Sequence, residues 1–462
     1  MPLPQTRDAP QLRLQQRSLT ARVAETLRHF APLGFISFGG PGVHVVLLRR
    51  RFVDELKWVS SATFNDLLSL GNALPGPGST QLAFSIALVR NGTVAGLLAF
   101  CLWSFPAAIG MTALAAGVRS LPESLPPSVL STLSGVNAAA VGMIALAAYQ
   151  LALSSITDGA TQLVFLGTAA LSLLHSASWV YPACVLSGGL LLLLWDYRGA
   201  VLSSSAAEQQ PLLSAAHGSL EEQAEAAEEE EHLMTLPPKW GLALVAVFVA
   251  SVLAVAVVRS RPMGVLAEVF TSMFTAGTII FGGGPVVIPL LRGYMVSTSL
   301  VSSRDFLLGF ALLQSFPGPN FAFSCFLGGL AISARLGSAC LPLGSALAFV
   351  GIFYPGILLK LALLPAYKSW KSLRAVKSML RGLAPAASGL VLAAVWQLFQ
   401  VGNLHASPGG HTESGSLASH PFWPIVAAFA FVLVKDWRMP PWLVVALGAA
   451  AGALKWKVQQ LA

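Results

Sequence analysis

Long apolar segments separated by short polar loops run through most of the chain. Apolar runs about as long as a bilayer-spanning helix, roughly 20 residues, cover approximately 24–48, 61–89, 92–117, 129–154, 161–174 and 178–195. After a polar interval the runs resume near residue 240 and continue to about residue 454. The pattern predicts an all-α, polytopic membrane protein.

Four clusters of glycine and proline interrupt these apolar runs. They are Phe38-Gly-Gly-Pro-Gly42, Pro75-Gly-Pro-Gly78, Phe281-Gly-Gly-Gly-Pro285 and Pro317-Gly-Pro319. Inside a helix, glycine costs about 1 kcal/mol and proline about 3 kcal/mol relative to alanine. Non-helical backbone survives at membrane depth only where protein or a polar cavity satisfies its N–H and C=O groups. We therefore expect the four breaks to form the walls of a solute site. The alternative is that they only kink helices and allow close packing.

The second half of the chain repeats the first. Ala24-Glu25 matches Ala267-Glu268, and Phe38-Gly39-Gly40 matches Phe281-Gly282-Gly283, at an offset of 243 residues. Pro75-Gly-Pro77 matches Pro317-Gly-Pro319 at an offset of 242. The identities fall on rare residues in order, which indicates an internal repeat.

The run over 240–258 has no counterpart in the first half. Six runs and this extra one separate the starts of the repeats, and an odd number makes the two halves face opposite ways, as in many secondary transporters. The sequence thus predicts two inverted halves of about six spans each plus one extra span. A re-entrant segment would change this parity.

Composition agrees with a membrane protein. Of the 462 residues, 55% are hydrophobic and 10% are charged, and the mean hydropathy is +0.69, whereas soluble proteins carry about 25% charged residues. Residues 196–239 are instead rich in Ser, Ala, Gln and Glu, a composition typical of disorder. We predict a polar segment over 1–23, a first repeat over 24–195, an acidic disordered linker over 196–239 and a second repeat over 240–462.

The net charge of +8 does not indicate a nucleic-acid partner, because the cations are spread over short loops without interleaved aromatic residues. By the positive-inside rule they place the amino terminus and the acidic linker in the cytoplasm. The Arg49–Arg51 cluster falls on the wrong side of this topology. The sequon Asn91-Gly-Thr93 falls inside, so sugar on Asn91 would overturn it.

Each break should expose the amino end of a new helix, whose free N–H groups and positive dipole end favour an anion. Hydroxyl and amide groups flank the breaks and suit a tetrahedral oxyanion, which needs many donors. The predicted substrate-binding residues are Gly39, Gly40, Pro41, His44, Asn72, Pro75, Gly76, Pro77, Ser79, Thr80, Gln81, Gly282, Gly283, Gln314, Pro317, Gly318, Pro319 and Asn320.

Four repeat-matched charged residues are candidates for gating or coupling. Glu25 and Glu268 could relay protons, since an ionisable group in a membrane segment is a functional hypothesis, or could be solvated acids near helix starts. Arg49 and Arg292 could attract a dianion or belong to positive loops. His44 has Val287 as its counterpart and could titrate or pack as a hydrogen-bonded side chain.

The sequence gives no sign of an enzyme. It has no paired carboxylates at depth, no His-Glu-x-x-His and no Walker-type loop, and its four cysteines lack metal-type spacing. We expect no cofactor and no metal.

The motifs around the breaks resemble those of the chromate ion transporter family, in its long two-domain form. The resemblance rests on Phe38 to His44, Phe52-Val-Asp-Glu55 with Trp58, Pro75 to Gly78, and the two second-half breaks. It implies a secondary transporter that moves chromate, with sulfate as the analogue, across a membrane, most simply the plasma membrane. An oxyanion channel or a general sulfate permease is the alternative. The coupled proton, the lipid bilayer and a second copy in a homodimer are the further partners to be tested.

Overall fold

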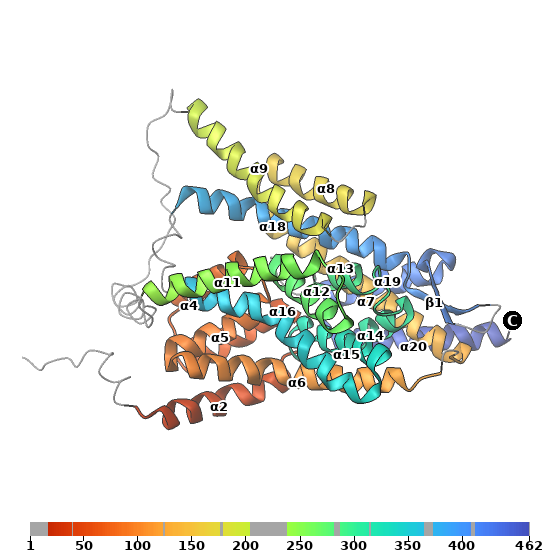
Figure 1. Cartoon of the computed structure of the whole chain (residues 1–462). Helices are drawn as coiled ribbons and strands as arrows, with labels where there is room; N and C mark the ends of the chain where they lie inside the picture. The colour runs from red at the N-terminus through yellow and green to blue at the C-terminus, as the bar shows by residue number, and fades with distance from the viewer. Residues whose placement is uncertain are drawn as a thin grey trace, which may run out of the picture.

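The computed structural model describes residues 17–38, 40–122, 125–175, 179–203, 238–280, 287–313, 316–364, 373–407 and 412–461. Most of these residues are helical, and the long helices run roughly parallel across the view in Figure 1. The first-half helices are α2 (Leu19–Ile36), α3 (Gly40–Arg49), the π-helix η1 (Arg50–Glu55), α4 (Ser61–Ala73), α5 (Gly78–Asn91), α6 (Thr93–Arg119), α7 (Pro127–Ser155), α8 (Gly159–Leu174) and α9 (Val180–Ser203).

The second half begins with α11 (Pro238–Arg259) and ends with α20 (Pro441–Leu461). Between them lie α12 (Val265–Ile279), α13 (Val287–Met295), α14 (Ser303–Leu313), η3 (Asn320–Ala322), α15 (Phe323–Leu336), η4 (Ser338–Cys340), α16 (Leu341–Leu363), α18 (Arg374–Phe399), η5 (Leu417–Ser419) and α19 (Phe422–Lys435). Among the described residues, six helices are long and apolar enough to cross a membrane. The molecule is therefore an all-α polytopic membrane protein, as predicted.

One element departs from the helical pattern. The segment between α18 and α19 contains an antiparallel pair of strands, β1 (Asn403–Ala406) and β2 (Thr412–Gly415). The pair docks on α7, where the backbone N–H of Leu404 donates to Ser134 Oγ at 2.8 Å. Four-residue strands leave too weak a period-two pattern to be seen in the sequence.

Helices α2 and α3 fold back on each other at the first break. Phe30 stacks on Phe52 with ring centroids 4.6 Å apart, and Arg51 Nη2 lies 3.2 Å from His29 Nδ1. A straight helix would separate positions 30 and 52 by about 33 Å, at 1.5 Å per residue. The chain therefore reverses at the break and forms a hairpin.

Helices α4 and α5 form a second hairpin around the second break. The guanidinium of Arg90, in the last turn of α5, lies 5.6 Å from the ring of Trp58, just before α4. Asn91 Nδ2 donates to Thr26 Oγ1 of α2 at 3.0 Å. The open ends of both hairpins thus lie where α2 begins, which we call the amino-terminal side.

The second half has the same two hairpins. Arg259 contacts both Ser272 Oγ of α12 (3.3 Å) and the ring of Tyr294 of α13 (5.6 Å). Phe306 of α14 packs on Phe323 of α15 with centroids 5.2 Å apart. These hairpins open at the opposite side of the molecule, because Arg119, at the far end of α6, donates to Ser333 near the end of α15 at 2.8 Å.

The predicted breaks are confirmed at the ends of the described helices, but each interrupted run reverses direction where the sequence led us to expect a crossing. Hydropathy cannot distinguish the two, because a hairpin and a span are equally apolar. The described helices between the repeats are α6, α7, α8, α9 and α11, an odd number, and all of them except the 16-residue α8 are long enough to cross a membrane. The halves are therefore inverted, and their hairpins enter from opposite ends (Figure 1).

The α2–α3 hairpin also explains why the Arg49–Arg51 cluster seemed to disagree with the positive-inside rule. Because α3 and η1 return toward His29 of α2, this cluster lies on the amino-terminal side together with Arg17, Arg22 and Arg90. Helix α9 continues to Ser203 and α11 begins at Pro238, so the described helices extend into both ends of the predicted linker. Residues 204–237 lie outside the described part of the chain.

Helix α7 packs against α18, α19 and α20, and these four helices form a layer. Small residues allow this close packing: Gly135 of α7 lies against Gly448 and Gly452 of α20, where any Cβ would overlap backbone atoms. Helices α8 and α9 cover α18 on the outside (Figure 1). This layer supports the hairpins from one flank.

Candidate functional site

The tips of the hairpins are joined across the two halves by a pair of backbone hydrogen bonds. The N–H of Gly318, in the fourth break, donates to the carbonyl of Ser37 in the first break at 2.7 Å. The N–H of Gly76, in the second break, donates to the carbonyl of Ile280 at the third break, also at 2.7 Å. Ser37 matches Ile280 and Gly76 matches Gly318 at the repeat offsets. The four breaks therefore meet at two symmetry-related junctions.

Both donating residues must be glycine. Gly76 has φ +112° and Gly318 has φ +99°, a region that costs an L-residue roughly 1–2 kcal/mol. A Cβ on Gly318 would lie 2.8 Å from Ala107 Cβ of α6, and one on Gly76 would lie 3.2 Å from Gly356 Cα of α16. The junctions are thus closely covered by α6 and α16.

His44 stabilises the Ser37–Gly318 junction through hydrogen bonds at both ring nitrogens. Its ring is fully buried, with Nε2 3.0 Å from the Ser37 carbonyl and Nδ1 3.1 Å from Ser79 Oγ. A carbonyl can only accept, so Nε2 carries the proton and the Ser79 hydroxyl donates to Nδ1. The neutral ring thereby links α3 to the amino end of α5. Trp103 of α6 packs edge-on against it at 5.1 Å.

Several buried donors beside the junctions have no partner among the described residues. These side-chain groups are the hydroxyls of Ser37 and Thr80 and the indole N–H of Trp103. Gln81 uses its amide N–H on the carbonyl of Pro75 at 2.6 Å, while its Oε1 has no partner. Buried polar groups are normally satisfied, so this arrangement offers hydrogen-bond donors to a ligand.

A cavity of about 620 Å³ opens beside the first break. Its inner wall contains Phe38, Gly40 and Asn320, so the first and fourth breaks both contribute to it. Its outer wall is made by α7 from Met143 to Ser154 and by the α19–α20 loop with Arg438. The α7 portion alone is about 16 Å long. The cavity therefore leads from the Ser37–Gly318 junction to the amino-terminal side, and we call it the junction cavity.

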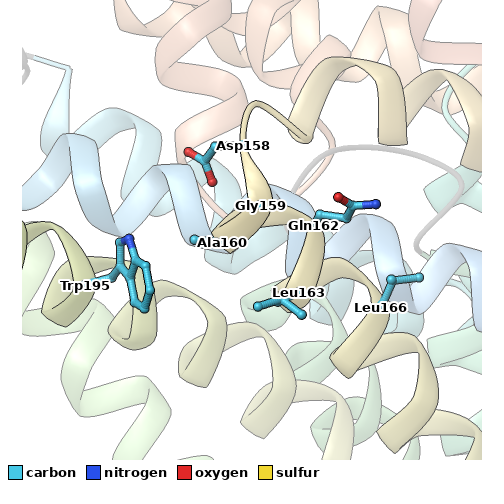
Figure 2. Close-up of a pocket in the computed structure, with 7 residues that line it drawn as sticks. All are labelled: Asp158, Gly159, Ala160, Gln162, Leu163, Leu166 and Trp195. Carbon is cyan, nitrogen blue, oxygen red and sulfur yellow. The ribbon is translucent and has the colours of Figure 1, made fainter.

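A larger cavity, about 800 Å³, lies between α8 and α9 and involves none of the breaks (Figure 2). Leu163, Leu166 and Trp195 make most of its wall, with Asp158 and Gln162 at one rim. The carboxylate of Asp158 already caps α8 through the Thr161 N–H at 2.9 Å and contacts Arg381 at 3.4 Å. This outward-facing apolar cavity suits acyl chains better than an anion.

The predicted site residues separate into three groups. Residues that the junctions bring together or that line the junction cavity are Gly40, His44, Pro75, Gly76, Pro77, Ser79, Thr80, Gln81, Pro317, Gly318, Pro319 and Asn320. Pro41 lies in the first turn of α3. Asn72 is exposed, although its Oδ1 lies against Gly78 at the second break. The residues outside the described part of the chain are Gly39, Gly282, Gly283 and Gln314.

The four gating or coupling candidates lie away from the junctions. Glu25 pairs with Arg17 at 2.9 Å and Arg90 at 3.6 Å on the amino-terminal side. Arg49 is exposed and lies 6.0 Å from the Phe64 ring. Glu268 is half-buried in the first turn of α12. Arg292 lines a separate cavity of about 320 Å³ with Tyr181, Gln397 and Gln400.

The structure adds residues that the sequence did not single out. Trp103 and Arg438 belong to the site described above, and Lys360 of α16 is fully buried, with Nζ donating to the Leu67 carbonyl at 2.8 Å. The sequence showed Lys360 only as a cation near a span end. One sequence signal could have identified Lys360. It stands one helical turn after Tyr354-Pro-Gly356 of α16, the stretch that packs against the second break.

Comparison with known proteins identifies the family. The family profile described as chromate transporter matches residues 24–193 and 267–453, which is most of both halves. The chain belongs to the chromate transporter family. The chain is 26% identical to the chromate transport protein of Pseudomonas aeruginosa, over 80% of either chain. It is also 26% identical to the probable chromate transport protein of Synechococcus elongatus, over 93% of this chain and 94% of that one.

A third relative, the chromate transport protein of Cupriavidus metallidurans, is 25% identical over 81% of this chain and 82% of its own length. No solved structure matches the chain. The matched regions stop short of 196–239 and resume after α11. The family resemblance seen in the sequence is thus confirmed over the two repeats that carry the breaks.

Proposed function

We propose that this chromate transporter family member is a secondary carrier that moves chromate, with sulfate as its structural analogue, by holding the anion at the junctions of the broken helices. The observation that carries the proposal is the pair of crossing hydrogen bonds, Gly318 to Ser37 and Gly76 to Ile280. They join the tips of the hairpins of one half to those of the inverted other half, at two junctions. Inverted repeats around a central site are suited to alternating access.

The chemistry of the junctions favours an anion. Helices α3 and α5 begin at the breaks, at Gly40 and Gly78, so their amino ends contribute free N–H groups and positive dipole ends. The partnerless donors of Ser37, Thr80 and Trp103 add to these. No carboxylate lines the described wall of the junction cavity. A tetrahedral oxyanion accepts from many donors, which matches this set.

The junction cavity indicates which side is open. It reaches Ser154 and Arg438 on the amino-terminal side, while the described hairpins of the second half cover the junctions from the opposite side. The described cations at the amino-terminal helix ends include Arg17, Arg22, Arg28, Arg49, Arg50, Arg51, Lys57, Arg90, Arg374, Lys377, Arg381, Lys435 and Arg438. The positive-inside rule then makes this side cytoplasmic, with the structure open inward and the plasma membrane as its location.

The membrane potential sets the energetic constraint on direction. Entry of a dianion against a potential negative inside costs about 2.3 kcal/mol per charge per 100 mV. Efflux is therefore the easier process without coupling, and uptake needs a co-ion such as a proton. Glu25 and Glu268 are our candidates for proton coupling, and Arg49 and Arg292 for gating.

Flux measurements in proteoliposomes test the proposal. We expect chromate flux that saturates, is inhibited by sulfate and responds to imposed pH and voltage gradients. A linear current that follows voltage would favour an oxyanion channel, and sulfate flux without chromate flux would favour a sulfate permease. The size of the purified protein in detergent tests the homodimer.

A further inference from the structure

We propose that Lys360 is the counter-charge for the bound dianion and sets the preference of the site for divalent oxyanions. This inference deepens the proposed function and rests on it. The feature that carries it is the fully buried Lys360 side chain close to the tip of the α4–α5 hairpin, in a segment where no role has been assigned.

The position of Lys360 follows from how α16 covers the second break. Gly356 lies one turn before Lys360 on the same face, and a Cβ on Gly356 would lie 2.8 Å from the carbonyl of Pro75. A Cβ on Gly71 would lie 3.7 Å from Lys360 Nζ and 3.2 Å from the carbonyl of Gly78. The ammonium is therefore at the tip of the α4–α5 hairpin, next to the first turn of α5.

The ammonium is poorly compensated for a buried charge. It has three N–H donors, and its one acceptor among the described residues is the Leu67 carbonyl at 2.8 Å. No described carboxylate forms an ion pair with it. Burial without a counter-charge favours the neutral amine, and an anion close by favours the protonated form. A dianion at the junction would supply the missing negative charge and accept the two remaining N–H groups.

The internal repeat gives an independent argument for a functional role. Phe105-Pro106-Ala107 of α6 covers the other junction as Tyr354-Pro355-Gly356 of α16 covers this one. By this alignment the counterpart of Lys360 is Met111, which is also fully buried. At the equivalent position of the first half, the apolar side chain of Met111, which is of similar length, is therefore enough to fill the space. The lysine adds a charge that packing does not require.

The test compares chromate with perchlorate, a tetrahedral oxyanion of single charge, in proteoliposomes at pH 8. We expect Lys360→Met to raise the chromate KM by about ten-fold or more, equivalent to roughly 1.4 kcal/mol, and to leave the perchlorate inhibition constant nearly unchanged. Lys360→Arg keeps the charge and should stay close to wild type. Met111→Leu is the repeat-matched control and should leave both constants unchanged.

An unchanged chromate KM in Lys360→Met, or an equal shift of the chromate and perchlorate constants, would overturn the proposal. If perchlorate does not inhibit, the contrast between Lys360→Met and Lys360→Arg in chromate KM decides it. A variant that fails to fold is recognised by size-exclusion chromatography, and Lys360→Gln then replaces it. Absence of chromate flux in the wild-type protein would instead contradict the proposed function itself.

Discussion

The two junctions share one backbone geometry but differ in their side chains. The Ser37–Gly318 junction has His44, which uses both ring nitrogens on neighbouring groups, and its counterpart in the second half is Val287. The Ile280–Gly76 junction has Lys360, with Met111 as the counterpart in the first half. The backbone symmetry thus builds both junctions, and one basic residue near each makes the candidate site chemically asymmetric. A carrier can keep the shared geometry for movement while the two junctions handle the anion differently.

Substitution of the junction glycines should have the largest effect. Gly318→Ala and Gly76→Ala both place a Cβ at positive φ, at a cost of roughly 1–2 kcal/mol. The new Cβ would overlap Ala107 of the covering helix α6 in the first variant and the Gln81 amide of α5 in the second. We expect chromate flux to fall to background and the melting temperature to decrease in both. Gly117→Ala is the control, since a Cβ there meets nothing within 4 Å. Normal flux in either junction variant would show that the shared backbone geometry is dispensable.

Replacement of His44 should affect the first junction selectively. His44→Ala leaves the Ser37 carbonyl and the Ser79 hydroxyl without their buried partner, a loss of about 1–3 kcal/mol. We expect kcat/KM for chromate to fall by roughly 10- to 100-fold. Val287→Ala, at the matched position, should retain activity within a few-fold. Equal losses in the two variants would mean that the asymmetry between the junctions has no functional meaning.

Asn72 tests the exposed edge of the second junction. Its Oδ1 lies against Gly78, so Asn72→Leu should impair flux by about an order of magnitude through loss of one or two hydrogen bonds to the bound anion, without loss of expression. Asn65→Leu on the exposed part of the same helix is the matched control. Gln314→Leu makes the equivalent test in the second half. Full activity in both Asn72→Leu and Gln314→Leu would remove these residues from the site.

Arg438 should contribute modestly, through attraction at the mouth of the junction cavity. Its side chain is exposed, so its field is screened by salt over about 8 Å at physiological ionic strength. We expect Arg438→Gln to raise the chromate KM by roughly two- to five-fold at low salt and to match wild type at high salt. The control is Lys435→Gln, whose ammonium lies over the ring of Tyr149. A KM increase that is independent of salt would argue against steering.

Asp158, remote from both junctions, should affect stability alone. Hydrogen bonding to the Thr161 backbone N–H, aided by Arg381, lowers the pKa of its carboxyl. Loss of such a helix cap costs about 1 kcal/mol. The depressed pKa places this stabilisation above the unfolded-state pKa of about 3.9, and it is lost as the pH falls through the folded-state pKa. We expect Asp158→Ala to melt earlier at pH 7, with the difference shrinking toward pH 3 and chromate KM unchanged.

The sequence predicted where the helices break, because the breaks depend on backbone chemistry. Glycine and proline at Gly76 and Gly318 have few roles inside an apolar run, and their repetition at a fixed offset indicated that both served the same purpose. The family followed from the same residues. The sequence could not show whether the chain reverses at a break or continues across the membrane, because hydropathy is the same for the α2–α3 hairpin as for a spanning helix.

Side chains contributed by distant helices were also inaccessible to the sequence. Trp103 and Lys360 reach the junctions only because α6 and α16 pack over the breaks, and nothing local to either residue reveals that packing. The sequence also led us to treat two residues as equivalent that have different surroundings in the structure. Arg49 and Arg292 are equivalent by repeat, yet one is exposed and the other lines a separate cavity with Tyr181, because the helices around them differ.

The crossing hydrogen bonds also constrain the order of events during synthesis. The Ser37 carbonyl receives its Gly318 partner only after about 280 further residues have left the ribosome, which takes on the order of 15 to 60 seconds at typical rates. Until then the tips of the first two hairpins lack their hydrogen-bond partners from the second half. The first half of the chain must therefore enter the membrane before the hydrogen-bond partners of its break exist, so its native tip geometry is completed only when the second half arrives.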